Sequence, residues 1–362
     1  QMKILYDSQI FFLQKYGGVS LYFANLINHL NNGKNYAHIF SPFYTCQILQ
    51  DLKLEKFIKG KKIERIPRYS TKIIKLINEL SFEMYAKIYK PDVIHFTFFE
   101  KKFNLNNIKK IITVYDCIHE KYYNIKDHKK KIIDLADHVI CISKSTQRDL
   151  LKIYGISEDR TSVIYLGSSF SENIRNYSQI NINNKPYILF VGNRFKYKNF
   201  LNFIKSISSS KILKNNIEIV CFGIYPFTQY EIEFFLQEGL DIKKIHFISG
   251  EDSTLQELYI NAFMLVYPSL YEGFGLPILD AMSLGCPVAC SNTSSMLEVG
   301  EDAPKYFDPN SQDDIRLSIE KVFLSDNLRV KMIAKGLEQS KKFSWKNCAI
   351  ETLAIYKNVA EK

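Results

Sequence analysis

The chain has 362 residues, of which 46% are hydrophobic and 24% are charged, and its formal net charge is +10. This length exceeds one ordinary hydrophobic core and fits two domains, and the composition is globular, which argues against a disordered protein. No window holds the roughly 18 apolar residues that a membrane-spanning helix needs, so the sequence does not predict an integral membrane protein.

Short apolar runs alternate with helical patterns from the N-terminus onward. Strand-like runs are expected at residues 2–7, 92–99, 111–116, 138–143 and 161–166, and helical patterns at 17–30 and 145–155. This alternation predicts right-handed βαβ units and a largely parallel sheet. The stretch GSSFSENIRNYSQININNK that follows is polar and rich in Ser and Asn, which is typical of an interdomain linker.

Basic residues cluster between Lys53 and Lys90. The second half of this stretch has apolar residues at helical spacing: Ile73, Ile74, Leu76, Ile77, Leu80, Phe82 and Met84. Such a basic amphipathic segment can lie on an anionic membrane surface, although a solvated helix in a Lys-rich chain explains the pattern equally well. No helix-turn-helix, zinc-finger or RNP-like pattern is present, so we expect no nucleic-acid partner.

A second alternating series follows the linker. Strands are expected at residues 186–192, 217–223, 244–250, 263–269 and 286–292, and helices at 200–208, 231–239 and 253–262. The fold class is therefore α/β, with two Rossmann-like domains facing each other across a cleft.

We expect an N-terminal domain over residues 1–168, a linker over 169–185, a C-terminal domain over 186–342, and a last helix over 343–362 that returns to the first domain. Ligands of open α/β sheets bind outside the carboxyl ends of the strands, so the cleft is the expected site.

The stretch YEGFGLPILDAM, residues 271–282, places one acid before two glycines and another acid after a proline. Gly273 and Gly275 let backbone N–H groups approach a ligand, and Pro277 suits the first turn of a helix, whose N-terminus favours a phosphate or sugar oxygens. Glu272 on the loop and Asp280 on the helix can then reach two parts of one polyhydroxylated, phosphate-bearing ligand. A tight βα turn, with Asp280 only complementing the helix dipole, is the alternative.

The stretch VGNRFKYKN follows another predicted strand. It places Asn193, Arg194 and Lys198 at that strand's carboxyl end, where the two cations suit a pyrophosphate that gains charge as a glycosidic bond breaks. A solvated basic loop is the alternative. Gly17 and Gly18 precede a helix and can meet the same diphosphate from the other domain. Neither G-x-G-x-x-G nor a P-loop motif is present, which disfavours dinucleotide redox chemistry and NTPase activity.

Four residues of the first domain are candidates for the acceptor side: His95, Tyr115, Asp116 and His119. His95 and Tyr115 are expected at strand ends that face the cleft. A structural role is as well supported as a functional one for the two histidines.

These stretches together resemble retaining nucleotide-sugar glycosyltransferases of family 4, which have the GT-B fold. The resemblance rests on KYGGVSLYF, IITVYDCIHE, VGNRFKYKNF, YPSLYEGFGLPILDAMSLGCPVACSN, DAPKYFDP and FSWKN, which span most of the chain. The chain resembles in particular bacterial mannosyltransferases of O-antigen and polysaccharide biosynthesis.

The resemblance implies a role for each residue of the motif. Glu272 would contact hydroxyls of the transferred sugar, and Asp280, where the family has Glu, would hold the ribose hydroxyls. The backbone N–H groups of Phe274, Gly275 and Leu276 would meet the sugar and phosphates. Tyr115 stands where relatives often have His.

The implied activity is transfer of a hexose, with mannose from GDP-mannose favoured, to a hydroxyl of a lipid-linked or growing oligosaccharide. No cofactor beyond the nucleotide sugar and no metal is expected, and the expected location is cytoplasmic, with peripheral contact at the inner, anionic face of the membrane. The alternatives are a family 4 transferase that uses a UDP-sugar and a degenerate GT-B protein that binds a nucleotide or glycan without turnover.

Overall fold

The computed structural model describes residues 2–31, 36–100, 105, 107–125, 127–170, 185–194 and 196–361, without the side chains of residues 127 and 128. The chain divides into two compact units: Gln1–Gly167 with Trp345–Lys362, and Ser168–Ser344. Most of the predicted linker over residues 169–185 lies outside the described residues. In the described ranges, no helix combines the length and the apolar character that crossing a membrane requires.

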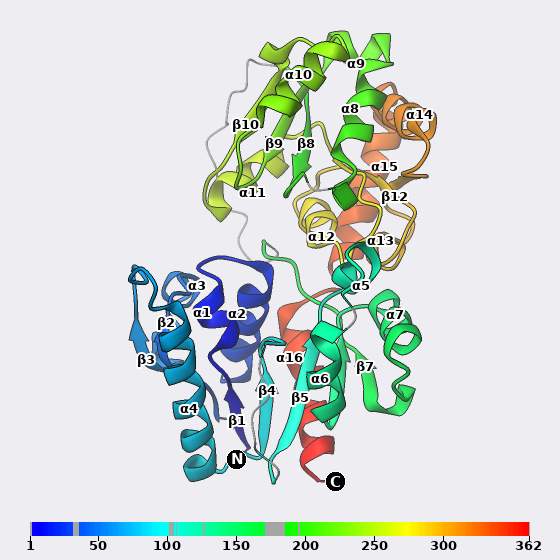
Figure 1. The fold of residues 1–362 in the computed structure, drawn as a ribbon. Coiled ribbons are helices and arrows are strands. Elements are labelled where there is room, and N and C mark those ends of the chain that lie inside the picture. Colours follow the sequence, from blue (N-terminus) through cyan, green and yellow to red (C-terminus); the bar gives the residue numbers. More distant parts are fainter. Residues whose placement is uncertain are drawn as a thin grey trace. The chain divides into compact units, whose positions relative to one another are not determined.

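The first unit is built on a sheet whose described strands all pair in parallel, in the order β3-β2-β1-β4-β5-β6-β7 (Figure 1). Its strands are β1 (Lys3–Tyr6), β2 (Tyr36–Tyr44), β3 (Ile58–Lys62), β4 (Val93–Phe96), β5 (Lys109–Val114), β6 (His138–Cys141) and β7 (Thr161–Val163). Its helices are α1 (Gln9–Leu13), α2 (Gly18–Leu30), α3 (Ile48–Asp51), α4 (Thr71–Tyr89), α5 (Ile118–Tyr122), α6 (Asp127–Leu135), α7 (Lys144–Tyr154) and α16 (Trp345–Ala360), with the 3-10 turns η1 (Glu55–Phe57) and η2 (Glu158–Arg160).

Helices cover both faces of this sheet. Phe82 of α4 and Leu150 of α7 share a core with Ile94 and other strand residues on one face. Neighbouring strand residues point to the opposite face, where α2 and α16 pack together and His95 meets Tyr356 of α16. The predicted return of the last helix to the first unit is confirmed.

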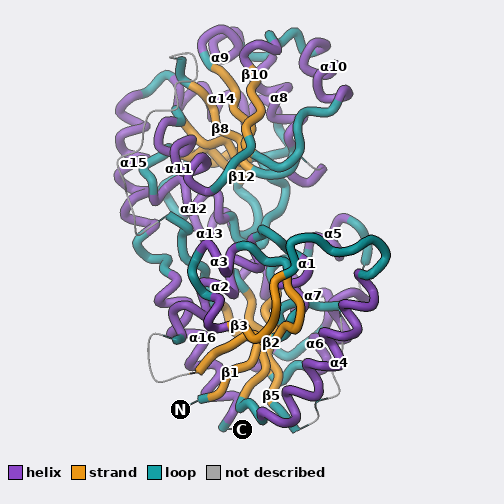
Figure 2. Tube along the Cα trace, turned by 90° about the vertical axis from the view of Figure 1, so that its left-hand side faces the viewer, coloured by secondary structure: helices purple, strands orange, loops and turns teal. Residues whose placement is uncertain are grey.

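The second unit has a parallel sheet in the order β10-β9-β8-β11-β12-β13. Figure 2 labels β8, β10 and β12 of this sheet among the helices of the same unit. Its strands are β8 (Tyr187–Val191), β9 (Glu218–Phe222), β10 (Ile245–Ile248), β11 (Met264–Tyr267), β12 (Val288–Ser291) and β13 (Lys305–Phe307). Its helices are α8 (Phe200–Ser208), α9 (Lys211–Asn216), α10 (Gln229–Gln237), α11 (Asp252–Asn261), α12 (Leu276–Ser283), α13 (Met296–Gly300), α14 (Gln312–Phe323) and α15 (Asp326–Ser340), with the 3-10 turns η3 (Lys196–Lys198) and η4 (Ile242–Lys244).

The strand order of the second unit reverses between β8 and β11. From β8 the chain runs outward through β9 to β10, and it then returns to β11 on the other side of β8. The loops that follow β8 and β11 therefore leave the sheet side by side at its carboxyl edge, which is where open α/β sheets bind ligands. The predicted α/β class with two parallel sheets is confirmed.

Candidate active site

The loop after β11 turns into α12 at a glycine. Gly275 has φ +98°, and a Cβ at this position would lie 3.4 Å from the Cδ1 atom of Ile278, so glycine relieves both strain and crowding. Pro277 occupies the first turn of the helix. The N–H groups of Ile278 and Leu279 donate to the Gly275 carbonyl, which leaves the N–H groups of Gly275 and Leu276 without a partner among the described residues.

Glu272 is buried in this loop, with 8% of its surface exposed. Its backbone N–H donates to Ser294 Oγ at 2.9 Å, and its carbonyl accepts a hydrogen bond from Ser295 Oγ at 2.9 Å. The loop after β12 thus fixes the loop after β11, so the carboxylate of Glu272 is held on a rigid backbone.

Lys198 brings the loop after β8 to this carboxylate. Its ammonium Nζ lies 2.6 Å from Glu272 Oε1 and donates to the Tyr267 hydroxyl at 2.9 Å. A Cβ at Gly192, which has φ +115°, would stand 3.9 Å from Nζ. Both side chains of the ion pair are nearly buried, with 12% of Lys198 and 11% of Glu272 exposed.

The pair retains unused hydrogen-bonding capacity. An ammonium has three N–H donors, and Lys198 directs two of them to Glu272 and Tyr267. The Tyr267 hydroxyl also interacts with the Glu272 carboxylate, and Lys198 meets Oε1 of that carboxylate, which leaves Oε2 outside the ion pair. Burial, followed by the negative charge of Glu272, raises the pKa of Tyr267 well above its usual range, so this hydroxyl stays protonated. The pair therefore offers a cation and an acceptor oxygen to one ligand.

Arg194, predicted to contact the diphosphate, has partners within the second unit instead of Glu272. Its Nε donates to Glu231 Oε1 at 2.5 Å, and its Nη2 donates to Glu231 Oε2 at 3.2 Å and to the Pro226 carbonyl at 2.8 Å. The rings of Phe200, Phe227 and Phe247 lie 4.8 to 5.8 Å from its guanidinium carbon. Glu231 also closes the capping box of α10 with Thr228. Arg194 therefore stabilises the fold of the second unit.

We expect Arg194→Met to lower the free energy of unfolding by about 2–3 kcal/mol, because Glu231 would keep a nearly buried charge without its partner. Urea unfolding of the purified variant measures this loss. Arg194→Met with Glu231→Gln should recover part of it. If Arg194→Met were as stable as the wild type but unable to bind a nucleotide, the result would indicate that Arg194 contacts the ligand.

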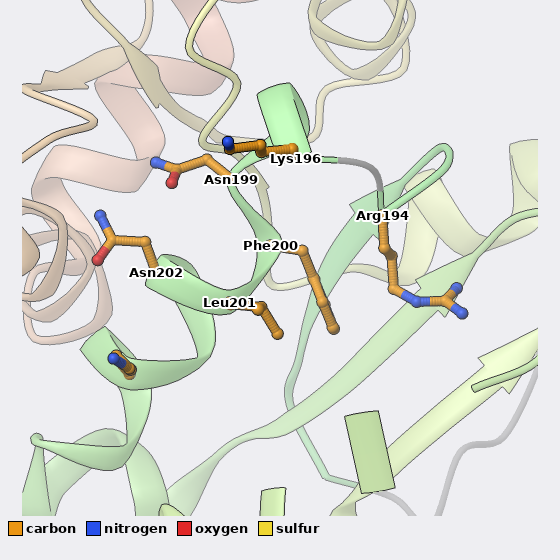
Figure 3. A pocket seen from close by; sticks show the side chains of 7 residues that line it. Arg194, Lys196, Asn199, Phe200, Leu201 and Asn202 are labelled. Atoms are coloured by element: carbon orange, nitrogen blue, oxygen red, sulfur yellow. The ribbon is translucent and has the colours of Figure 1, made fainter. Parts of the chain in front are cut away.

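A pocket of about 530 Å³ lies beside the start of α8. Figure 3 shows the Arg194 side chain pointing away from Lys196 and Asn199. Asn199 and Asn202 both donate to the carbonyl of Pro309, at 2.7 and 2.8 Å. These amides hold the loop before α14, so the pocket is lined partly by groups with structural partners. The amide of Asn193, by contrast, has no partner among the described residues.

Asp280 is the fifth residue of α12, on the helix as predicted, and is 6% exposed. Its Oδ1 accepts hydrogen bonds from Ser168 Oγ and from the Ser169 N–H, both at 2.9 Å. Burial raises its pKa to about 7, despite these two hydrogen bonds. Its predicted role toward ribose therefore requires that it exchange these partners or use Oδ2.

This raised pKa predicts a pH dependence of stability. Between pH 4 and 7 the unfolded chain loses the proton of Asp280 while the folded chain keeps it, so this group makes the protein less stable as pH rises. We expect Asp280→Asn to be the more stable protein at pH 8, by on the order of 2 kcal/mol, and to approach the wild type at pH 4. Urea unfolding at four pH values tests this, and a constant difference between the two proteins would contradict it.

The N-terminus of α2 holds the predicted glycines. Gly17 is the N-cap residue, and a Cβ there would lie 2.2 Å from Gln14 Oε1, which accepts a hydrogen bond from the Ser20 N–H. Gly18 has open space beside it. The side chain of Gln14 thus takes the place that a side chain at position 17 would fill, and it caps α2.

His95 is fully buried in the first unit, which favours the structural alternative for this residue. Its ring nitrogens pair with the Tyr356 hydroxyl at 2.6 Å and with Thr113 Oγ1 at 2.9 Å. Burial lowers its pKa to about 3, so the ring is neutral. Tyr115 packs against Tyr22, and its buried hydroxyl has no hydrogen-bond partner among the described residues.

Asp116 and His119 lie at the start of α5, where Asp116 Oδ1 accepts from the Ile118 N–H at 2.9 Å. Close to them is a buried ion pair that the sequence did not reveal, between Lys129 and Glu120, with Nζ 3.1 Å from Oε2. Lys129 also donates to the Asp116 carbonyl at 2.6 Å. These contacts give this buried lysine a structural role.

The structure thus pairs Lys198 with Glu272, whereas Arg194 pairs with Glu231. Asp280, although on the same helix as Leu276, is engaged by Ser168 and Ser169. No group of three or more His, Cys, Asp and Glu side chains within the described ranges could hold a metal ion.

Two family models match the sequence and meet between the units. Residues 16–169 match the model "Glycosyltransferase Family 4", and residues 172–339 match "Glycosyl transferases group 1". Together they cover most of both units. The chain belongs to the family 4 glycosyltransferases.

Curated relatives agree with this membership of the glycosyltransferase family. The chain is 30% identical over 236 residues to O-antigen chain mannosyltransferase B of Escherichia coli, which covers 62% of this chain and 61% of the relative. It is 28% identical over 196 residues to the O-antigen chain mannosyltransferase RfbU of Salmonella typhimurium, covering 53% of each chain. The matches thus span somewhat more than half the length of these relatives.

Solved glycosyltransferases share the whole GT-B fold. A glycosyltransferase from Rickettsia africae superposes with a TM-score of 0.74 at 20% identity, over 99% of this chain and 98% of the other. HepE from Anabaena, solved in complex with UDP-glucose, has a TM-score of 0.74 at 15% identity, over 98% of this chain and 100% of the other. At these identities the likeness concerns the fold.

Proposed function

We propose that this family 4 glycosyltransferase is a retaining enzyme that moves mannose from GDP-mannose to a hydroxyl of a lipid-linked or growing oligosaccharide of a bacterial surface polysaccharide. The ion pair of Lys198 and Glu272 carries this proposal, because it places a cation and a carboxylate beside the N-terminus of α12 at the strand-order reversal. The names of the O-antigen mannosyltransferase relatives support mannose as the sugar.

Different residues of the second unit bind the sugar and the nucleoside diphosphate of the donor. Oε2 of Glu272 accepts hydrogen bonds from sugar hydroxyls, and the remaining N–H of Lys198 binds a phosphate oxygen, with the N–H groups of Gly275 and Leu276 beside it. Asp280 is proposed for the ribose hydroxyls.

The bond from the sugar's anomeric carbon to the phosphate oxygen breaks, and a bond to the acceptor oxygen forms on the same face. The leaving phosphate oxygen takes the acceptor's proton, so no protein nucleophile is needed. Positioning of the donor and stabilisation of the charge growing on the diphosphate are the protein's contribution, with Lys198 supplying positive charge without a metal ion.

A UDP-sugar is the second candidate donor, since HepE of the same fold was solved with UDP-glucose. Thermal unfolding of the protein with GDP, UDP, ADP and their sugars separates the candidates, because a ligand that binds only the folded state raises the melting temperature. We expect one nucleotide to give a selective rise that Lys198→Met abolishes. No rise with any nucleotide would overturn the proposal.

A further inference from the structure

Helix α4 has an apolar face toward the sheet of the first unit. Asn78, Phe82 and Ala86 are buried on this face, and the ring of Tyr85 stacks on Phe40 of β2 at 4.1 Å. The spacing of these residues, three or four apart, is what a helix on the surface of a sheet needs to anchor itself.

The opposite side of α4 carries a second apolar stripe that no described residue covers. Its members are exposed by 41 to 79%: Ile73, Leu76, Ile77, Leu80, Met84 and Ile88. They too are three or four residues apart and therefore form one continuous stripe along about four turns. Single exposed apolar residues are ordinary, whereas a continuous apolar patch marks an interaction surface.

The surroundings of this stripe are strongly basic. Residues 53–90 contain eleven Lys or Arg and four Glu, a net charge of +7 within a chain whose total is +10. Strand β3 lies at the edge of the sheet beside β2 (Figure 1). Its residues Lys59 and Lys61 are exposed. The turn before α4 exposes Arg65 and Arg68, and it holds Tyr69 at φ +68° with 85% of the residue exposed.

We propose that this surface, the α4 stripe with its basic surroundings, docks on a bilayer that contains anionic lipids. Apolar side chains on one side of a helix enter the acyl region, cations meet the head groups, and an exposed tyrosine suits the boundary between them. The alternative is a dimer in which a second copy of the chain covers this surface. Such a dimer would bring together two segments that each carry a net charge of +7, and charge repulsion opposes this. Docking needs neither donor nor turnover, so it stands or fails independently of the proposed reaction.

Co-sedimentation of the whole protein with vesicles tests this inference. We expect at least about tenfold stronger binding to phosphatidylcholine vesicles with 30% phosphatidylglycerol than to pure phosphatidylcholine at 50 mM salt, and most of this preference should vanish at 500 mM salt. Ile73→Gln with Leu80→Gln and Met84→Gln should weaken binding about tenfold or more. Lys61→Gln with Arg65→Gln and Arg68→Gln should remove the preference for anionic lipid.

The second unit offers matched controls. Leu317→Gln with Leu324→Gln and Val330→Gln removes three apolar side chains that are 53 to 65% exposed, and Lys243→Gln with Lys321→Gln and Lys331→Gln removes three exposed lysines. Both should bind vesicles within about twofold of the wild type. Three outcomes would each overturn the proposal. The protein could bind neutral and anionic vesicles equally, or the control variants could lose as much vesicle binding as the α4 variants. Alternatively, the stripe variant could change only the oligomeric state, measured by light scattering.

Discussion

Glu272→Gln is expected to lower kcat with the true donor by about 10²–10³-fold. In the proposed mechanism the carboxylate stabilises the positive charge that develops on the sugar and accepts its hydroxyls, while its ion-pair partner Lys198 binds the phosphate. The amide keeps the size of the side chain, so the loop held by Ser294 and Ser295 should persist. Nucleotide release from the donor, followed at saturating donor, measures the loss.

The matched control is Glu251→Gln, an exposed acid just before α11. It should retain the wild-type rate. The affinity of Glu272→Gln for the nucleoside diphosphate alone should change only a few-fold, because the proposed contact of Glu272 is with the sugar. Turnover of Glu272→Gln within a few-fold of the wild type would remove this residue from the mechanism.

Lys198→Met is expected to weaken nucleoside diphosphate binding by about 10–100-fold, the effect of one charge-assisted hydrogen bond, and to reduce turnover by about 10²-fold or more. The substitution keeps the length of the side chain and removes its charge, so Glu272 loses its cation. Calorimetric titration and turnover assays separate the two effects, and Lys198→Arg should restore part of each because it restores the charge.

Two further variants serve as controls for this result. Lys196→Met removes an exposed neighbouring cation and should bind nucleotide within about threefold of the wild type. Arg194→Met should lose stability while retaining nucleotide affinity under conditions where it is folded. If Arg194→Met abolished binding and Lys198→Met did not, the assignment of the two cations would be reversed.

Much of the second unit's site could be predicted from local sequence. Buried apolar runs followed by glycine and polar residues place Lys198 and Glu272 at strand ends, and parallel strands deliver such residues to one edge of a sheet. The basic stretch before Lys90 and its helical spacing likewise indicated α4 and its exposed face. In contrast, β2 and β3 were not predicted, and the short β3 is nearly all polar.

Local sequence could not predict the directions of side chains or their partners at distant positions in the chain. Arg194 binds Glu231, 37 positions away, and Asp280 binds Ser168, 112 positions away, so neither partner could be chosen from the motif. His95 bonds to Tyr356 across 261 positions, a contact that favours its structural alternative and that no local pattern could predict. The buried pair of Lys129 and Glu120 joins a residue of α6 to a residue of α5, and no local pattern encodes this pairing.

The most direct test of the proposed reaction is proton NMR of the purified protein with GDP-mannose, and separately with UDP-glucose, in the absence of acceptor. The account predicts slow release of the nucleoside diphosphate from one donor, first appearance of the free sugar in the donor's own anomeric configuration, and loss of both in Glu272→Gln. Bound donor that stays intact at every protein concentration would contradict a transferase and identify a protein that holds nucleotide sugars without turnover.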